Sequence, residues 1–376
     1  MAIKYEKCPS PSYVLDEAKL VENLVLLKEV QEKAGVSIIL ALKAFSMWKL
    51  FPLVGQYLSG ATASSLHEAR LIFEEMERKA HTYSPAYLPA EFDQIVRYSS
   101  HITFNTITEY ERHRAKVSPG LSMGLRVNPG YSPVETDLYN PAIAGSRLGE
   151  WPTALAGSWP VGIEGLHVHT LCESGADHFQ RLVEAVEQHF GPFLPQLKWV
   201  NFGGGHLITR EGYDVDLLIE TLVEFRSKYE VEVILEPGSA IAWETGDLVS
   251  TVLDIIDSGG VKTAILDVSF TAHMPDTLEM PYRPAIIGAT DPVAGKPTYR
   301  LGGVSCLAGD YLSEYSFENE LTVGDRVILK DMIHYTMVKT NHFNGVVHPS
   351  ICKWTMDGKL EVLKSFTFED YKGRLS

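Results

Sequence analysis

The sequence has few cysteines, and none is spaced as zinc ligands usually are. Four occur among the 376 residues, at Cys8, Cys172, Cys306 and Cys352, without a Cys-x-x-Cys arrangement. This spacing argues against a structural zinc site, and we predict no metal centre. Widely spaced cysteines are also typical of a reducing compartment, so we expect a cytoplasmic protein.

Positive charge is scarce as well. Lysine and arginine number 33 against 48 aspartates and glutamates, which gives a formal net charge of −15. A surface of this sign repels phosphate backbones, so we predict that nucleic acid is not a partner. The charge would suit a cationic substrate, although an acidic surface also serves solubility alone.

Long apolar runs are missing too. No stretch reaches the roughly 18 consecutive apolar residues of a transmembrane helix, so we predict no membrane partner. Residues 1–6 also lack the apolar core of a secretory signal. The chain is longer than the size at which one hydrophobic core usually stops growing, and we therefore predict two domains.

From about residue 13 onward, strand-like and helix-like stretches alternate. Helical periodicity separates most of the apolar runs, and eight such repeats predict a (β/α)8 TIM barrel over residues 13–243. In such a barrel the catalytic residues lie at the C-terminal ends of the strands. A doubly wound sheet is the alternative, but no early Gly-x-Gly-x-x-Gly supports it. The predicted strands are residues 37–42, 60–64, 79–83, 102–105, 123–128, 163–170, 198–202 and 231–235, and the main helical patterns are 49–58, 66–78, 89–99, 108–117, 176–189 and 214–229.

Helical periodicity stops near Trp243. Strand-like runs follow at residues 248–256, 264–268, 298–304, 326–329, 335–338 and 360–366, separated by turn residues. This pattern predicts an all-β barrel or sandwich formed by residues 244–376 together with the lead-in 1–12. Within the first domain, the irregular stretch between residues 128 and 163 is expected to be a functional loop.

Lys43 directly follows an apolar run of strand character. At a strand end among apolar neighbours, burial disfavours the ammonium form and lowers the pKa of a lysine. A neutral amine is the form that Schiff-base chemistry needs. The alternative is an ordinary lysine whose stem packs on the strand while its amine reaches solvent.

Two further strand ends carry residues that would suit a phosphorylated cofactor. The glycine run 203–205 follows the seventh predicted strand, where barrels commonly bind phosphate through backbone N–H groups, although a plain tight turn has the same pattern. Glu236 ends the eighth strand. Its carboxylate would keep the ring nitrogen of pyridoxal 5'-phosphate (PLP) protonated, or would pair with an arginine such as Arg126 or Arg147.

A pair of histidines and one cysteine complete the candidates. His167 and His169 lie on the sixth predicted strand, and we expect one to face the barrel axis and the other the helices. A histidine in this mouth could stack on a cofactor ring, although a lone histidine is more often structural. Cys306 lies with Asp310 in a glycine-flanked loop of the second domain, which is less typical of a core cysteine.

In this order, the residues resemble the PLP-dependent decarboxylases of the alanine-racemase-like fold (fold type III), a group that includes the ornithine and diaminopimelate decarboxylases. The resemblance covers nearly the whole chain and implies a PLP-binding TIM barrel followed by a β domain. It rests on Lys43, Ser65 with Glu68, Ser146-Arg147-Leu148-Gly149, His169, the glycine run 203–205, Glu236-Pro237-Gly238, Cys306 with Asp310, Tyr335, and Phe343-Asn344-Gly345.

Within this group the sequence is most similar to the carboxynorspermidine (carboxyspermidine) decarboxylases. The similarity lies in residues 166–173, in His206 after the glycine run, and in the segments 273–276 and 278–284. It implies PLP-dependent decarboxylation of carboxynorspermidine or carboxyspermidine to norspermidine or spermidine and CO2, in polyamine biosynthesis. The alternatives are a diaminopimelate or other basic amino-acid decarboxylase, an amino-acid racemase, and a non-catalytic PLP-binding or regulatory homologue.

The resemblance also implies roles for individual residues. Lys43 would bind PLP covalently, His169 would stack on its ring, and Glu236 would pair with its ring nitrogen. Cys306 would return a proton to the substrate carbon, and would enter with Asp310 from the partner of a homodimer. The further expected cofactor-binding residues are Ser65, Arg147, Gly203, Gly204, Gly205, Gly238 and Tyr335, and the expected substrate-binding residues are Glu173, His206, His273, Asp276, Glu279 and Asp310.

Two positions depart from the pattern of the group. Ser239 stands where many relatives carry a phosphate-binding arginine, so phosphate binding should depend more on backbone N–H groups and hydroxyls. Thr62 stands where the ornithine enzymes carry an acidic residue, which makes ornithine a poorer choice of substrate.

Overall fold

The computed structural model describes residues 2–279 and 281–376. Met1, in the predicted lead-in, and Met280, in the segment 278–284, lie outside the described residues. The chain divides into two compact units, which we call the β unit (Met1–Glu22 with Ala242–Ser376) and the barrel unit (Asn23–Ile241). The domain boundaries expected at residues 12–13 and 243–244 stay a prediction.

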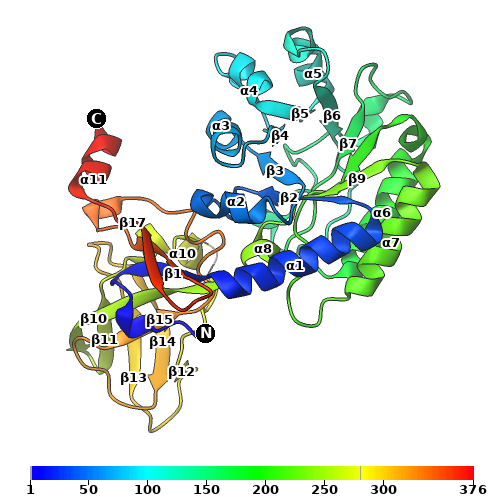
Figure 1. Cartoon of the computed structure of the whole chain (residues 1–376). Coiled ribbons are helices and arrows are strands. Elements are labelled where there is room, and N and C mark those ends of the chain that lie inside the picture. The colour runs from blue at the N-terminus through cyan, green and yellow to red at the C-terminus, as the bar shows by residue number, and fades with distance from the viewer. Residues whose placement is uncertain (1, 280) are drawn as a thin grey trace. The chain divides into compact units, whose positions relative to one another are not determined.

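The barrel unit is a closed ring of parallel strands with helices outside it (Figure 1). Each strand pairs with the next in chain order, and the ring closes where Ser37 lies opposite Ile234 and Ile38 opposite Leu235. Every strand overlaps a predicted apolar run, which confirms the TIM barrel. The strands are β2 (Ser37–Ala41), β3 (Gly60–Ala63), β4 (Ala80–Tyr83), β5 (Ser99–Phe104), β6 (Ser122–Arg126), β7 (Gly165–His167), β8 (Trp199–Asn201) and β9 (Glu232–Leu235).

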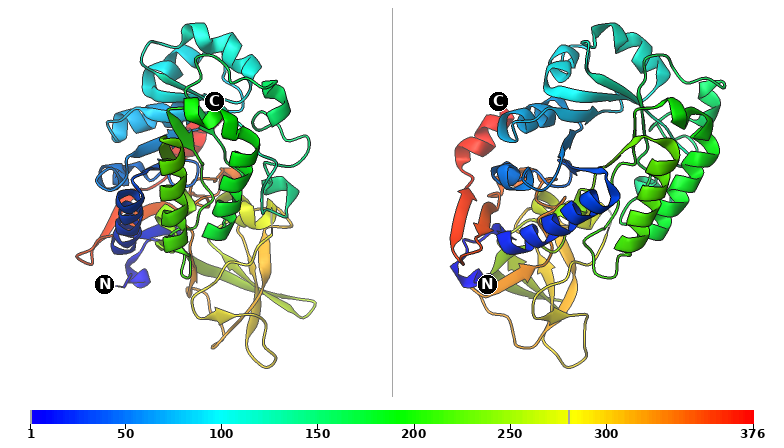
Figure 2. Two further views of the ribbon diagram at one scale, coloured as in Figure 1. Left: turned by 90° about the vertical axis from the view of Figure 1, so that its right-hand side faces the viewer. Right: turned by 45° about the vertical axis from the view of Figure 1, so that its right-hand side comes forward.

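Helices cover the outer face of the barrel, and Figure 2 shows α6 and α7 side by side there. The helix α1 ends before Gly35, whose φ of +66° is a conformation that favours glycine. Between β6 and β7 the helical elements among the described residues are short 3-10 turns, at Asp137–Tyr139 and Pro152–Leu155, and Val127 forms an isolated bridge with Glu150, as expected for an irregular loop. The helices are α1 (Glu17–Ala34), α2 (Phe51–Val54), α3 (Leu66–Glu75), α4 (Phe92–Tyr98), α5 (Ile107–His113), α6 (Ala176–Phe190), α7 (Val215–Tyr229) and α8 (Ser239–Ala242).

A tryptophan fills the barrel interior on the side opposite the strand ends that carry Lys43 and Glu236. Trp199 on β8 is 2% exposed and packs with Ile39 and Ile234. A Cβ added to Gly165 on β7 would lie 2.0 Å from the indole ring, and one added to Gly124 on β6 would lie 2.2 Å from it. The two glycines therefore make the space that the indole occupies.

The β unit is built on a mixed sheet in the order β12-β14-β13-β11-β10-β1-β16-β17, with β15 paired to β10 (Figure 1). The strand β1 lies antiparallel to β10 and parallel to β16, so both ends of the chain contribute to one sheet. The strands are β1 (Ser12–Asp16), β10 (Gly246–Ser258), β11 (Val261–Leu266), β12 (Ala289–Thr290), β13 (Thr298–Gly302), β14 (Tyr311–Phe317), β15 (Arg326–Leu329), β16 (Ser350–Trp354) and β17 (Leu360–Lys364).

The predicted β domain is confirmed as a sheet, but its elements differ in three respects. The run 335–338 is a turn, because Tyr335 has a φ of +48° and its carbonyl accepts hydrogen bonds from the N–H groups of Val338 and Lys339. The strands β1, β12, β14 and β16 were not predicted. Short helices also occur at α9 (Phe270–His273), α10 (Asp276–Glu279) and α11 (Phe368–Leu375).

Within residues 2–279 and 281–376, no helix combines the length and the apolar character that crossing a bilayer requires.

Candidate active site

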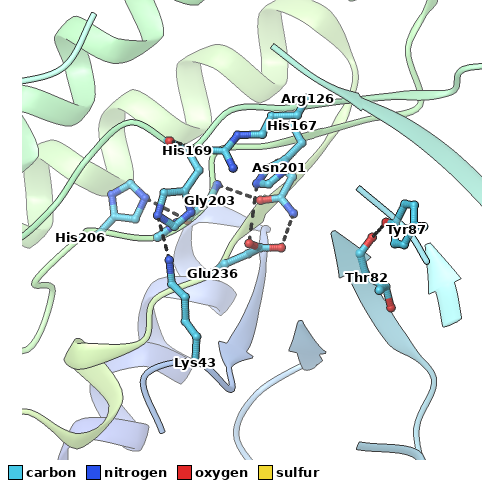
Figure 3. Close-up of polar contacts among 11 residues, drawn as sticks. Lys43, Thr82, Tyr87, Arg126, His167, His169, Asn201, Gly203, His206 and Glu236 are labelled. Atoms are coloured by element: carbon cyan, nitrogen blue, oxygen red, sulfur yellow. Dashed lines mark hydrogen bonds and ion pairs between the residues drawn. The ribbon is translucent and has the colours of Figure 1, made fainter. Parts of the chain in front are cut away.

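Lys43 stands just beyond β2, where the chain turns. The N–H groups of Ala44 and Phe45 donate to the Ala41 carbonyl over 3.1 Å and 3.3 Å and close this turn. The lysine side chain points toward His169, and its Nζ lies 3.4 Å from His169 Nε2 (Figure 3). The strand end therefore presents the amine to other polar groups of the barrel unit.

The surroundings of Lys43 disfavour its charged form. Burial lowers its pKa most, the Arg126 guanidinium lowers it further, and Glu236 opposes the shift. The side chain still reaches solvent. Because protein atoms surround it on its other sides, an ammonium here loses much of its hydration.

The hydrogen bonds of His169 identify its tautomer. The Gly204 N–H donates to His169 Nδ1 over 3.1 Å, so Nδ1 must be the acceptor nitrogen and a neutral ring carries its proton on Nε2. Burial, Lys43 and Arg126 hold the pKa of His169 well below its usual value, which keeps the ring neutral. The Nε2–H group facing Lys43 can donate to a neutral amine but would oppose an ammonium, so the geometry also favours neutral Lys43.

Glu236 is 6% exposed and lies at the C-terminal end of β9. Its Oε1 accepts a hydrogen bond of 2.8 Å from Asn201 Nδ2. The amide of Asn201 is oriented by the Gly203 N–H, which donates to Oδ1 over 2.8 Å (Figure 3). Burial raises the pKa of Glu236, while hydrogen bonds from Asn201 and Thr62 oppose the shift.

His167 belongs to the same group and is 2% exposed. Neither of its ring nitrogens has a hydrogen-bond partner among the described residues, and Nε2 lies 3.7 Å from Glu236 Oε2. Burial holds the pKa of His167 well below its usual value. The expectation that His167 and His169 face opposite sides is wrong: both rings lie in one group, 6.4 Å apart, because residues two apart on an extended strand share a face.

The glycine run 203–205 packs directly on these side chains. An added Cβ would lie 2.6 Å from His169 Cβ at Gly203, 2.4 Å from the Glu236 carbonyl oxygen at Gly204, and 2.1 Å from the Leu171 carbonyl oxygen at Gly205. The Gly203 and Gly204 N–H groups bond Asn201 and His169. Among the described residues, no protein acceptor is found for the Gly205 N–H. The run is therefore both a tight junction and a source of a free backbone donor.

Three other predicted cofactor-binding residues belong to the barrel unit. Gly238 follows Glu236, and a Cβ added there would lie 2.4 Å from the Cβ of Ala44, the neighbour of Lys43. Ser65 caps α3, where its hydroxyl accepts from the Glu68 N–H over 3.2 Å. Arg147 is exposed in the loop after β6, and its carbonyl accepts from Asn105 Nδ2 over 2.8 Å.

The two predicted substrate-binding residues of the barrel unit differ in exposure. Glu173 is exposed and has a φ of +47°. His206 is 1% exposed, its ring packs edge-on against Phe179, and its Nε2 lies 3.2 Å from the Gly203 carbonyl oxygen. Burial lowers the pKa of His206 to about 4. The burial of His206 suits a residue that supports the glycine run, and its substrate-binding role stays a prediction.

The remaining predicted residues belong to the β unit. Cys306 is exposed, whereas Asp310 and His273 are buried. Asp276 and Glu279 lie on α10, and both carboxylates bond the ammonium of Lys339. Tyr335 is half-buried in the turn described above.

Sequence reasoning did not identify Asn201. It considered Arg126 only as a possible partner of Glu236, and His167 only as one of two histidines on a strand. Asn201 orients toward Glu236, and Arg126 donates from its Nη2 to the His169 carbonyl over 2.9 Å. All three residues end barrel strands, so the strand-end rule was the available signal.

The group could also be considered as a metal site. Ligand atoms of His167, His169 and Glu236 all lie within 4.8 Å of one another. Two observations oppose a cation: the Arg126 guanidinium already places a positive charge beside His169, and the acceptor nitrogen Nδ1 of His169 already bonds Gly204. The chemistry of the group instead suits an organic cofactor that a neutral amine and a carboxylate can hold.

Comparison with known proteins agrees with this assignment. The family model described as "Pyridoxal-dependent decarboxylase, C-terminal sheet domain" matches residues 12–333. A carboxyaminopropylagmatine decarboxylase of Synechocystis sp. is 49% identical over 369 residues, which span 98% of this chain and 95% of that relative. A carboxynorspermidine/carboxyspermidine decarboxylase of Campylobacter jejuni is 41% identical over 381 residues, which span 98% of this chain and 99% of that relative.

Solved structures are similar over the same extent. The crystal structure of carboxynorspermidine decarboxylase from Campylobacter jejuni, complexed with norspermidine, superposes with a TM-score of 0.90 at 40% identity and covers 97% of this chain and 99% of that chain. Diaminopimelate decarboxylase from Helicobacter pylori superposes with a TM-score of 0.82 at 18% identity, covers 97% of this chain and 96% of that chain, and shows the shared fold alone. The resemblance noted from the sequence is confirmed, together with decarboxylase chemistry and the PLP cofactor. The chain belongs to the family of pyridoxal-dependent decarboxylases.

Proposed function

We propose that this decarboxylase acts on carboxynorspermidine or carboxyspermidine and releases norspermidine or spermidine with CO2 in polyamine biosynthesis. The observation that carries the chemistry is the group formed by Lys43, His169 and Glu236 at the strand ends (Figure 3). The substrate class is supported by the 41% identical relative and by the 40% identical structure complexed with norspermidine.

A second substrate is carboxyaminopropylagmatine, and the 49% identical Synechocystis relative favours it. Such a molecule would end in a guanidinium in place of an ammonium. A planar guanidinium prefers a bidentate carboxylate partner, so the two substrates need different geometry at the distal end of the pocket.

The residues at the barrel strand ends fit PLP. Burial lowers the pKa of Lys43, which favours the neutral form that covalent binding of the cofactor needs. Glu236 is a buried carboxylate with one oxygen held by Asn201. The glycine run leaves the Gly205 N–H without a protein acceptor among the described residues, as a phosphate site would require.

Each residue would then have a defined role. Lys43 would hold PLP, His169 would stack on its ring, and Glu236 would accept a hydrogen bond from its protonated ring nitrogen. Gly203, Gly204, Gly205, Gly238, Ser65, Arg147 and Tyr335 would surround its phosphate and the rest of the ring. When bound, PLP supplies an electron sink for the bond pair that remains on the substrate carbon as CO2 leaves.

The barrel residues prepare this chemistry by their protonation states. Asn201 holds the Glu236 carboxylate in one orientation, which would keep it directed at the ring nitrogen. His169 stays neutral and presents Nε2–H to Lys43, so the amine keeps its lone pair. Arg126 fixes the backbone of His169 by its bond to the carbonyl.

Cys306 would return the proton to the substrate carbon, from the second subunit of a homodimer. Its exposure supports this role, since a buried thiol could not meet a substrate. The exposed apolar residues Val304, Leu307 and Phe343 lie in the same region, because the Cys306 N–H bonds Asn344. An apolar patch of this kind supports contact with a second copy of the chain.

The substrate would be held by carboxylates that match its amines. Asp276 and Glu279 are the main candidates, with Glu173 as a third. The contact of Lys339 with both Asp276 and Glu279 supports an affinity of this pair for an ammonium. His206 and His273 would support the pocket, and the carboxylate of Asp310 is already occupied by its own chain.

We infer a cytoplasmic location from the cysteines, because all four are unpaired thiols.

The test is a CO2-release assay of the purified protein with PLP. Carboxynorspermidine and carboxyspermidine should be turned over, and ornithine and diaminopimelate should not. Turnover of carboxyaminopropylagmatine alone would establish the second substrate. Comparable turnover of ornithine, or racemised amino acid without CO2, would contradict the proposal.

A further inference from the structure

The loop that carries Cys306 is not held by packing. This cysteine loop, residues 303–310, joins β13 to β14 in the β unit. Val304, Leu307, Ala308 and Gly309 are exposed, as is Cys306 itself. An exposed loop gains little from apolar burial, so its shape depends on polar contacts.

The base of the cysteine loop is held by Asp310, which is 4% exposed. Its Oδ2 accepts hydrogen bonds from the Ser305 N–H and hydroxyl over 3.2 Å and 2.6 Å, and its Oδ1 accepts from the Thr271 N–H over 3.0 Å. A Cβ on Gly303 would lie 2.4 Å from the carboxylate, so glycine permits the close approach. A buried carboxylate needs such donors. The two from Ser305 hold the loop together internally, and the one from Thr271 attaches it to α9.

The tip of the cysteine loop is held by a different residue. The Cys306 N–H donates to Asn344 Oδ1 over 2.8 Å. Asn344 has a φ of +56°, in the left-handed region that asparagine tolerates better than most other side chains. A residue in this strained conformation is often part of a functional arrangement.

The segment that carries Asn344 is itself attached to α9. Asn341 Nδ2 donates to the Thr271 carbonyl over 2.8 Å, and the Asn341 N–H donates to the Ala272 carbonyl over 2.9 Å. Thr271 therefore bonds Asp310 through its N–H and Asn341 through its carbonyl. The base and the tip of the cysteine loop are therefore both attached, directly or through the 341–344 segment, to the backbone of Thr271.

We propose that Asn344 is a positioning residue that holds Cys306 where its thiol can reach the substrate carbon, with Asp310 fixing the base of the same loop. This proposal rests on the proposed role of Cys306. In that step the bond from the carbon to the carboxylate breaks, CO2 leaves, and the bond pair stays behind. A proton from Cys306 Sγ then forms the new C–H bond, and the thiolate regains a proton from water.

The position of the thiol decides where this proton goes. Proton transfer requires a donor within hydrogen-bond reach, and a misplacement of about 1 Å can cost on the order of a hundredfold in rate. If the thiol is displaced, CO2 can still leave, but the proton would be added to the bound cofactor in place of the substrate carbon. After hydrolysis the product would then leave as an aldehyde, while its amino group would stay on the cofactor. The ratio of polyamine formed to CO2 released then falls below one, whereas general destabilisation of the fold would lower both amounts together.

The matched variants are Asn344→Gly and Asn344→Asp. Glycine adopts the φ of position 344 without strain but removes the acceptor of the Cys306 N–H, whereas aspartate keeps an acceptor oxygen. With the holoenzyme and a saturating substrate, Asn344→Gly should lower kcat by about tenfold to a hundredfold. It should also lower the ratio of polyamine to CO2, and Asn344→Asp should restore the ratio.

Two further measurements separate positioning from folding. The absorbance of Lys43-bound PLP should be unchanged in both variants, because Asn344 bonds Cys306 and is not one of the residues assigned to PLP. The rate at which iodoacetamide alkylates Cys306, measured by peptide mass spectrometry, should change in Asn344→Gly and return in Asn344→Asp. An unchanged ratio and an unchanged alkylation rate in Asn344→Gly would overturn the proposal, and so would an Asn344→Asp variant that behaves like Asn344→Gly.

Cys306→Ala distinguishes this proposal from the proposed function. If Cys306→Ala lowers the product ratio and Asn344→Gly does not, the cysteine has its role but Asn344 does not position it. If Cys306→Ala leaves rate and ratio unchanged, the role of the cysteine fails and the positioning proposal fails with it.

Discussion

Replacement of Gly204 by alanine tests whether the glycine run sets the position of Glu236. The added methyl would lie 2.4 Å from the Glu236 carbonyl oxygen and 3.3 Å from His169 Cε1. Ordinary van der Waals contact begins near 3.4 Å, so the two backbones must separate by about 1 Å. The run cannot simply swing away, because the Glu236 N–H donates to the Gly203 carbonyl over 2.7 Å.

The expected loss follows from this displacement. Overpacking of this kind typically costs about 1–3 kcal/mol of stability, so the cofactor-free variant should unfold at a lower temperature. A shift of about 1 Å at Glu236 and His169 should lower kcat by roughly a hundredfold. PLP should also bind at least about tenfold more weakly, since the free N–H of Gly205 moves with the run.

The assays are titration of the cofactor-free protein with PLP, CO2 release at saturating substrate, and thermal unfolding. Gly373→Ala is the control, because an added Cβ there has no neighbour within 4 Å and the backbone is helical. Wild-type PLP affinity and kcat in Gly204→Ala would refute the argument that this junction positions the site.

Three further outcomes are expected. Lys43→Ala should remove the absorbance of lysine-bound PLP and abolish CO2 release. The cofactor-free variant should be as stable as the wild type at pH 7, because the lowered pKa of Lys43 indicates that its positive charge is unfavourable in the fold. A marked fall in the melting temperature would contradict this expectation. Glu236→Gln should lower kcat by at least about a hundredfold while PLP still binds. Glu232 is exposed on the same strand, and Glu232→Gln should change neither kcat nor PLP binding. Equal effects of the two substitutions would contradict the role of Glu236. Burial lowers the pKa of His206 to about 4 in the fold, so the unfolded chain binds the proton first as pH falls below about 6.5, and the free energy of unfolding falls by up to about 1.4 kcal/mol per pH unit between these values. In His206→Gln, the free energy of unfolding measured with urea should therefore depend less steeply on pH in this window. A slope equal to that of the wild type would contradict the argument.

The barrel could be predicted because its signal is local. Each strand is a short buried apolar run, and a stretch with helical periodicity separates most of these runs from the next. Strands that are neighbours in sequence are therefore neighbours in the ring. The same regularity put Lys43, the glycine run and Glu236 at strand ends. The family comparison then agreed with the chemistry that these residue types suggest.

The β unit was harder to predict because its pairings are not local. The strand β16 lies beside β1, at the other end of the chain, and nothing in the sequence of Ser350–Trp354 indicates that partner. The run 335–338 has strand composition, yet the left-handed Tyr335 makes it a turn. In the site, the orientation of Asn201 and the tautomer of His169 depend on contacts with the glycine run, which composition does not encode.

The packing of Trp199 against Gly124 and Gly165 limits how this barrel can change. An alanine at either glycine would overlap the indole, while a smaller residue at position 199 would leave a cavity on three strands at once. Each single step is therefore unfavourable, although the combined replacement of all three positions could restore the volume. The effects of substitutions at these three residues on the free energy of unfolding should therefore be strongly non-additive. Replacement of Trp199 should be tolerated only where the two glycines are replaced with it.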